Sequence, residues 1–356
     1  MEVRLPSGLN APTACVICPV MVQICCECKS HNGSMTTPLA PFKSLHYAGR
    51  APGPRLIVLG AVHGNETCGT RAIERVLAEL DSGALALAAG SVTFVPVTNA
   101  LAYAHGRRAG DRNLNRALQP TDAPREFEDH VANWLCPLLA AHEVLLDLHS
   151  FHGGGQAFVM VGPRDNAGPL EPFGQAGREE ALARRLGVGR AVEGWLDTYA
   201  AGVARRRRDA EAEGRAEALE MDPRYGVGTT EYMRSVGGCA LTLECGAHDD
   251  PASIDVAYGA IRNSLAHLGL SGEPPPAAQR LETLSLVSVV DKQDAADAFV
   301  RDWHSFDTLN QGETIGRRAS GELVSAPHDG WIVFPFAAAQ PRQEWFYLAR
   351  ASRRFD

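Results

Sequence analysis

Short apolar runs alternate with amphipathic segments along most of the chain. Nearly continuous apolar runs of strand length predict buried strands over 55–63, 91–99, 143–150, 157–162 and 239–246. Apolar residues at helical spacing predict helices over 67–80, 127–141 and 254–268. Strands that alternate with helices predict an α/β fold, in which a mostly parallel mixed sheet carries helices on both faces.

Two further regions show different patterns. Residues 174–222 combine helical propensity with many charges, including four consecutive arginines over 205–208, and this predicts a solvated helical insertion. A lid over a substrate site is the alternative interpretation. The proline-rich segment 271–276 predicts a linker, and short alternating runs between glycine turns predict a small all-β domain over 277–356. We therefore expect the α/β domain to span 42–270.

Residues 1–41 do not share this patterning, and we expect them to form a disordered, cysteine-rich leader. Five cysteines lie between positions 15 and 28, where thiolates could instead bind zinc, and the apolar stretch over 14–26 could be the core of a signal peptide. A start at Met35 would remove most of this segment. The other cysteines lie in apolar sequence, which predicts buried, reduced thiols at Cys68, Cys136, Cys239 and Cys245.

Composition narrows the classes of function. Hydrophobic residues make up 45% of the 356 positions and charged residues 21%, which is enough for a sizeable core. A net charge of −8 argues against a nucleic-acid binder, and no apolar run approaches the about 18 residues of a membrane-spanning helix. We therefore expect a cytoplasmic protein without nucleic-acid or membrane partners. Arginine greatly outnumbers lysine, which is typical of a GC-rich, bacterial genome.

Polar residues that could bind a metal follow two of the predicted strands. His63 and Glu66 come where the first strand passes into a helix, and His149 ends the third strand in the motif D-L-H-S. The carboxyl ends of parallel strands meet at one edge of a sheet, where ligands bind. Two histidines and one glutamate form a ligand set typical of hydrolytic zinc sites. His152 is a weaker candidate, because it lies in a glycine-rich loop.

Two more features could supply chemistry beside such a metal. Glu244 ends an apolar strand, where a carboxylate is costly without a partner or a task, and we assign it as general base and proton shuttle. The segment 106–116 is rich in arginine and asparagine, which can bind a carboxylate or stabilise an oxyanion. Taken alone, that segment could equally be a solvated basic loop.

Four motifs in order give the sequence a family resemblance. HGNE at 63–66, NLNR at 113–116, DLHS at 147–150 and TLECG at 242–246 resemble the succinylglutamate desuccinylase and aspartoacylase family, part of the zinc carboxypeptidase superfamily. The resemblance covers roughly 42–270 and implies a zinc carboxypeptidase-like fold. One position departs from the family pattern, because Asn113 stands where that family usually has aspartate.

The resemblance also implies roles for individual residues. It implies one Zn²⁺ per chain, held by His63, Glu66 and His149, with Glu244 as the catalytic glutamate. It implies that four other residues contact the substrate. Asn115 and Arg116 would bind its carboxylate, Arg108 would polarise the scissile carbonyl, and Arg234 would be an additional substrate-binding arginine.

The implied reaction is hydrolysis of the amide bond of a small N-acyl amino acid or a related acidic amide. A metal-activated water attacks the acyl carbon, and Glu244 passes its proton to the leaving amine. A carboxypeptidase acting on peptides and a metal-binding relative without turnover are the alternatives. The sequence leaves the acyl group, the amine and the physiological metal open, and it is compatible with a homo-oligomer.

Overall fold

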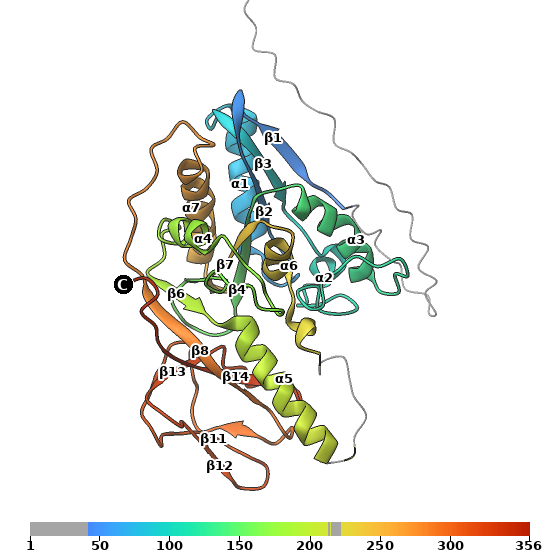
Figure 1. The fold of residues 1–356 in the computed structure, drawn as a ribbon, viewed down its shortest axis with the longest axis vertical. Coiled ribbons are helices and arrows are strands. Elements are labelled where there is room, and N and C mark those ends of the chain that lie inside the picture. The colour runs from blue at the N-terminus through green and yellow to red at the C-terminus, as the bar shows by residue number, and fades with distance from the viewer. Residues whose placement is uncertain (1–41, 213, 215–221) are drawn as a thin grey trace, which may run out of the picture.

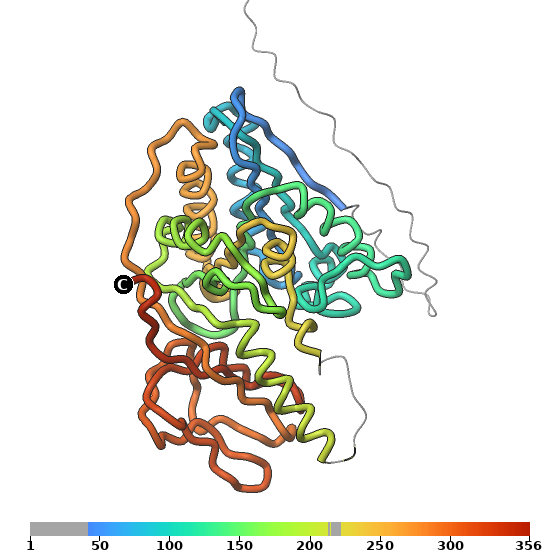
Figure 2. Tube along the Cα trace, viewed as in Figure 1, coloured from blue at the N-terminus to red at the C-terminus, as the bar shows by residue number. Residues whose placement is uncertain are grey.

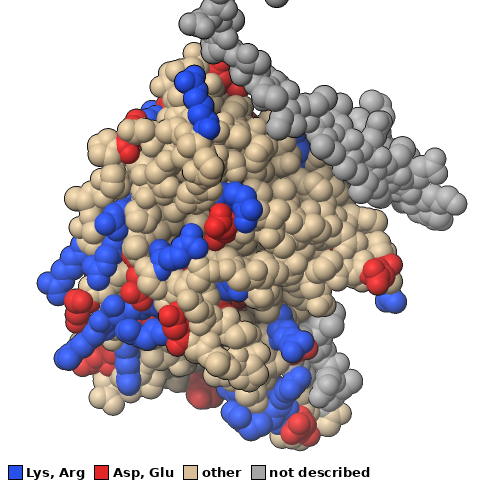
Figure 3. Space-filling view, turned by 45° about the horizontal axis from the view of Figure 1, so that its top comes forward, with Lys and Arg blue, Asp and Glu red and all other residues tan. Residues whose placement is uncertain are grey.

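The computed structural model describes residues 42–212, 214 and 222–356. The expectations for the leader over 1–41 lie outside the described residues. Within the described part, none of the helices has the length and apolar character needed to cross a membrane. On the face shown in Figure 3, basic side chains are interspersed with acidic ones. The described residues therefore present no continuous basic surface on that face.

An eleven-stranded mixed sheet runs through the molecule in the order β1-β3-β2-β4-β7-β5-β6-β8-β14-β13-β10. Its first half contains β1 (Leu45–Ala48), β2 (Ala51–Leu59), β3 (Ala89–Val95), β4 (Val144–Phe151), β7 (Cys239–Ala247) and β5 (Phe158–Met160). Strand β2 pairs in parallel with β3 and β4, and β4 pairs in parallel with β7, whereas β5 is antiparallel to β7. The predicted strand over 55–63 already ends at Leu59, so His63 lies in the following loop.

Helices cover both faces of this part of the sheet, as predicted (Figure 1). On β2, Leu56 and Val58 pack toward α1 (Cys68–Ser82) and α7 (Ala252–His267), whereas Ile57 and Leu59 belong to the core beside α3 (Phe127–Ala140). Short helices α2 (Ala100–Ala104) and α6 (Thr229–Ser235) complete this half of the molecule. Because both faces are covered, the strand reads as a continuous apolar run. Cys68, Cys136, Cys239 and Cys245 are buried free thiols, as predicted.

The charged segment 174–222 is more deeply built into the fold than expected. It contains α4 (Ala176–Ala183), β6 (Arg190–Glu193), α5 (Trp195–Ala212) and the residues up to the short 3₁₀ helix η2 (Pro223–Gly226). Strand β6 lies inside the sheet, and one face of α5 is buried, including Tyr199 and Val203. The prediction of a solvated insertion is therefore wrong for these elements. The four consecutive arginines suggested a fully exposed helix, whereas the helix is amphipathic and its apolar face is buried.

The C-terminal strands extend the main sheet. They are β8 (Glu282–Asp291), β9 (Ala298–Phe299), β10 (Thr308–Leu309), β11 (Thr314–Arg317), β12 (Leu323–Ser325), β13 (Gly330–Val333) and β14 (Glu344–Ala351). The chain descends from α7 along one edge, orange in Figure 2, and β8 then pairs in parallel with β6. A separate all-β domain is thus not confirmed, although the elements after residue 277 are all strands. Strand β8 also pairs with β14, and a small sheet β12-β11-β9 lies beside them.

Candidate active site

Three buried side chains converge at the edge of the sheet where β2 and β4 end. His63, Glu66 and His149 are each at most 2% exposed, and their ligand atoms lie within 4.8 Å of one another. Glu66 bridges the two imidazoles, because Oε1 lies 2.9 Å from His63 Nδ1 and Oε2 lies 2.9 Å from His149 Nδ1. The structure therefore brings together the three residues predicted to bind the metal.

The donor atoms of His63 suit a metal ion. Its Nε2 donates a hydrogen bond to Asn113 Oδ1 at 3.1 Å, an oxygen that also accepts from the Asn115 amide. The other ring nitrogen, Nδ1, is buried and faces Glu66 Oε1 at 2.9 Å, but it makes no hydrogen bond of suitable geometry to any described residue. Burial, assisted by the charge of Arg108, lowers the pKa of His63 to about 4. A neutral imidazole whose lone pair faces a carboxylate is the form that binds a metal.

His149 is oriented by a residue to which the sequence analysis assigned no role. Asp147 is fully buried on β4, and its Oδ2 lies 2.9 Å from His149 Nε2. Burial lowers the pKa of His149, but Asp147 and Glu66 outweigh burial and raise it well above its usual value. A carboxylate behind a metal-binding histidine is a recurring arrangement in zinc proteins. The i, i+2 spacing of Asp147 and His149 on a strand could have revealed it.

Glu244 lies beside this triad. Its strand, β7, pairs with β4 so that Glu244 is in register with His149. The side chain is 8% exposed, and Oε2 has no hydrogen-bond partner in the part of the chain that the structure describes. Burial is the main cause that raises the pKa of Glu244 to about 8. A carboxyl group in this environment can take up and release a proton near neutral pH.

The loop between α2 and α3 carries the predicted substrate-binding groups. Arg108 Nη1 donates to Glu66 Oε1 at 2.8 Å and keeps a half-exposed side chain. Asn115 Oδ1 accepts from the Thr229 amide at 2.9 Å, and Arg116 Nη1 donates to the carbonyl oxygen of Asn115 at 2.8 Å. The Arg116 guanidinium lies 5.0 Å from the Trp195 ring. The structure thus places all three predicted residues near the triad.

A buried glutamate holds this loop in place. Glu128, in the first turn of α3, accepts hydrogen bonds from the backbone amides of Gly110, Asp111 and Arg112 at 3.0–3.2 Å. It also accepts from Asn99 Nδ2 at 2.8 Å. These contacts are made only once the loop has closed against α3, so the sequence pattern contains no indication of them.

Arg234 differs from the other predicted site residues in its hydrogen bonds. Its guanidinium donates to Glu179 Oε1 at 2.7 Å, to Glu171 Oε1 at 2.8 Å and to the carbonyl oxygen of Ala240 at 2.8 Å. The residue is 5% exposed. These bonds tie α6 to α4 and β7, which gives Arg234 a place in the framework. Its role in substrate binding stays a prediction.

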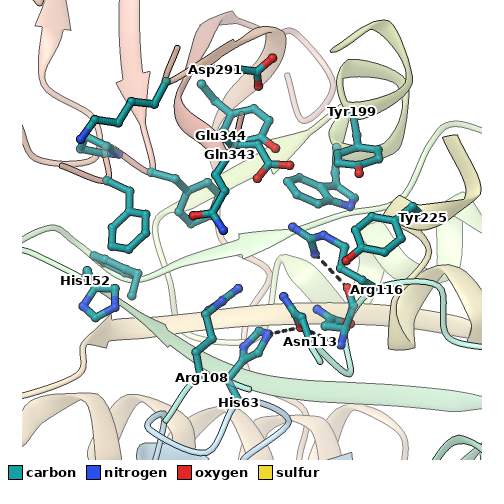
Figure 4. Close-up of a pocket in the computed structure, with 18 of the residues that line it drawn as sticks. His63, Arg108, Asn113, Arg116, His152, Tyr199, Tyr225, Asp291, Gln343 and Glu344 are labelled. Atoms are coloured by element: carbon teal, nitrogen blue, oxygen red, sulfur yellow. Dashed lines mark hydrogen bonds between the residues drawn. The ribbon is translucent and has the colours of Figure 1, made fainter. Parts of the chain in front are cut away.

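A cavity of about 1530 Å³ opens onto the triad. Its lining includes the predicted residues and side chains of α5, β8 and β14. In Figure 4, Arg116 and Tyr225 lie on one side of His63 and Arg108, and His152 lies on the other. His248, which the sequence analysis did not single out, packs edge-on against His152 at 4.4 Å and bonds to Ser150 Oγ through Nδ1 at 2.7 Å.

Comparisons with known proteins agree with the motifs. Residues 52–161 match the model of the succinylglutamate desuccinylase/aspartoacylase catalytic domain. No curated protein matches the chain. TLECG lies outside the matched range, so the position of Glu244 rests on the geometry described above.

Solved structures share the fold across most of the chain. The product-bound ectoine utilization protein EutE (DoeB) of Ruegeria pomeroyi is 17% identical with a TM-score of 0.64, over 87% of this chain and 89% of its own. A succinylglutamate desuccinylase/aspartoacylase of Rhodobacter sphaeroides is 17% identical with a TM-score of 0.63, over 88% and 90%. Succinylglutamate desuccinylase of Vibrio cholerae is 15% identical with a TM-score of 0.64, over 87% of each chain. At these identities the likeness shows the fold. The family resemblance is confirmed by the sequence match, and residues 52–161 belong to the succinylglutamate desuccinylase/aspartoacylase catalytic-domain family.

Proposed function

We propose that this chain is a zinc-dependent amidohydrolase that removes the acyl group from a small N-acyl amino acid. The observation that carries the proposal is the position of Glu244 beside a buried His-Glu-His triad, in one cavity with Arg116. The family match supports a deacylase-type hydrolase in general.

His63, Glu66 and His149 would hold one Zn²⁺, because their donor atoms converge and His63 Nδ1 has no hydrogen-bond partner among the described residues. When bound, Zn²⁺ supplies a Lewis acid and lowers the pKa of a bound water toward about 7. Asn113 and Asp147 fix the orientation of the two imidazoles from behind. The chain therefore presents the ligand atoms in a fixed arrangement before any substrate arrives.

Glu244 moves the proton in this proposal. Its partner-free Oε2 accepts a proton from the attacking water and then delivers it to the leaving amine. The half-exposed Arg108 can turn from Glu66 toward the oxygen that becomes negatively charged in the transition state. Arg116, with Asn115 beside it, binds a carboxylate of the substrate.

The enclosure of the cavity favours small substrates over peptides. Side chains of the C-terminal region, including Glu344 and Tyr347, line the cavity together with the triad. Figure 4 shows Glu344 and Gln343 across from His63 and Arg108. Because the C-terminal region contributes to the wall around the triad, we favour a small substrate, and a carboxypeptidase is the weaker candidate.

Amine release from a panel of N-acyl amino acids and short peptides tests the proposal. The panel carries acetyl, succinyl and formyl groups on acidic, basic and neutral amino acids, and compares zinc-loaded with chelated protein. We expect release that is sensitive to the chelator and confined to N-acyl amino acids. Release from peptides alone would replace the proposal with the carboxypeptidase function. No release from any compound, with one zinc bound per chain, would favour a binding role.

A further inference from the structure

Two opposite charges face the cavity without contacting each other. Arg116 comes from the N-L-N-R loop, and Glu344 is the first residue of β14. The hydrogen bond of the Arg116 guanidinium goes to the backbone of Asn115. Glu344 has no hydrogen bond or ion pair from its carboxylate to any residue that the structure describes. Both side chains line the pocket drawn in Figure 4.

The neighbouring charges at this end of the cavity are already paired or solvated. Asp291 accepts from Arg205 at 2.7 Å and from Arg206 at 3.0 Å. Other charges are accounted for in the same way: Lys292 donates to the Ala337 carbonyl, Arg318 pairs with Asp297, and Asp209 and Arg342 are exposed. Arg206 keeps Nε and Nη2 without a hydrogen-bond partner among the described residues, so this end of the cavity also offers a guanidinium beside Arg116. Glu344 is the acidic side chain here that a ligand cation can still pair with, because Asp291 is already paired with two arginines.

The position of Arg116 is well defined. Its guanidinium lies 5.0 Å from the Trp195 ring and 5.8 Å from the Tyr199 ring, both on α5. Burial lowers the pKa of Arg116, but Glu344 is foremost among the groups that outweigh burial and raise it. Glu344 is thus the main opposite charge acting on Arg116, although no hydrogen bond or ion pair joins the two side chains.

A ligand that satisfies both charges must carry a carboxylate and a cation. We propose that Glu344 binds the cationic side chain of the substrate, so that the chain acts on N-acylated basic amino acids. Their carboxylate binds Arg116, and their ammonium or guanidinium group binds Glu344. An acidic amino acid would instead place a second carboxylate against Glu344, and the repulsion would select against it. This inference rests on the proposed function, because it assigns the amine part of that substrate.

Six compounds test the inference, one acetyl and one succinyl derivative of each of three amino acids. They are the Nα-acyl derivatives of L-lysine, L-norleucine and L-glutamate. We expect kcat/KM for lysine to exceed that for norleucine at least about tenfold, because a charge-assisted hydrogen bond is formed with one and not with the other. Glu344→Gln should remove this preference, whereas Glu322→Gln, at an exposed position outside the cavity, should keep it. Equal rates for lysine and norleucine, or a preference for glutamate, would overturn the inference.

A binding measurement separates this inference from the proposed function. Calorimetric titration of the zinc-loaded protein with free L-lysine, L-norleucine and L-glutamate needs no turnover. Tighter binding of lysine that is lost in Glu344→Gln would support the cation site even if no acyl compound is cleaved. Equal binding of the three amino acids would overturn it even if acyl compounds are cleaved. Glu344→Asp, which keeps the charge and should keep the preference, shows that loss in Glu344→Gln is due to charge.

Discussion

Two buried clusters of charge in this protein are bonded very differently. In the cluster around Arg234, Glu179 and Glu171, every guanidinium nitrogen has a partner, and Glu179 also accepts from the Ala240 and Gly162 amides. In the cluster around His63, Glu66, His149 and Glu244, His63 Nδ1 faces Glu66 Oε1 at 2.9 Å without forming a hydrogen bond, and Glu244 Oε2 has no hydrogen-bond partner among the described residues. Burial without a partner is costly and marks reactive groups, whereas burial with a full set of bonds maintains the fold. The comparison therefore distinguishes buried charged residues that are available for a reaction from buried charged residues that stabilise the fold.

The largest expected effect concerns Glu244. Glu244→Gln removes the proton acceptor but keeps the shape of the side chain, so turnover should fall by ~10²–10⁴. Zinc content should not change, because the three ligand residues remain. Amine release and metal analysis on the same sample measure both. Wild-type turnover in this variant would show that the base lies elsewhere.

The next largest effect concerns Arg234. Arg234→Met should lower the free energy of unfolding by about 3–5 kcal/mol, because it leaves Glu179 buried without its counter-charge. Urea denaturation measures this loss. Arg108→Met is the comparison: its side chain is half-exposed and its partner Glu66 still faces His63 and His149, so the loss in the free energy of unfolding should be smaller while turnover falls.

The result for Arg234 also decides between framework and substrate binding. If Arg234→Met unfolds like the wild type and raises KM, the substrate-binding role implied by the family resemblance is correct. The structure favours the framework role, because all three nitrogens of the guanidinium donate to a partner, namely Glu179, Glu171 and Ala240.

The predictable part of the site is the part carried by local pattern. His149 and Glu244 could be placed because each ends an apolar strand, and ligands gather at strand ends in such sheets. His63 also lies beside Glu66 and His149, although its strand ends earlier, at Leu59. Such residues can be recognised in the sequence because a polar side chain directly follows or interrupts an apolar run.

The remainder depends on distant contacts that no local pattern contains. Arg234 pairs with glutamates 55 and 63 positions away, in or before a helix whose segment was interpreted as solvated. The C-terminal strands were expected to form a separate domain, because the four-residue strand β6 that joins them to the main sheet is short and half polar. Glu128 was overlooked for the same reason, since its partners are backbone amides of a closed loop.

A glycine beside the Arg234 cluster gives a smaller effect. A Cβ added at Gly162 would lie 2.6 Å from Arg234 Cζ, so Gly162→Ala must displace a guanidinium held by three partners. We expect a loss of ~1–3 kcal/mol in the free energy of unfolding by urea denaturation. Gly177→Ala, on α4 with open space around the added Cβ, should be neutral or slightly stabilising. Equal stability of the two variants would show that the Arg234 guanidinium can shift to make room for the added methyl group without losing its hydrogen bonds.

The smallest expected effect concerns the hydrogen bond behind His63. Asn113 offers a neutral amide oxygen to His63 Nε2, where the family pattern usually has a carboxylate. Asn113→Asp should strengthen this bond and raise the basicity of the imidazole, and zinc affinity should then rise by up to about tenfold. Competition with a chromogenic zinc chelator measures the change. Because Asn113 Oδ1 also accepts from the Asn115 amide, the substitution keeps the loop in place, and a change in affinity reports on the metal site itself. Weaker zinc binding would mean that a second carboxylate near Glu66 costs more than the stronger hydrogen bond contributes, and that the neutral asparagine is itself suited to this site.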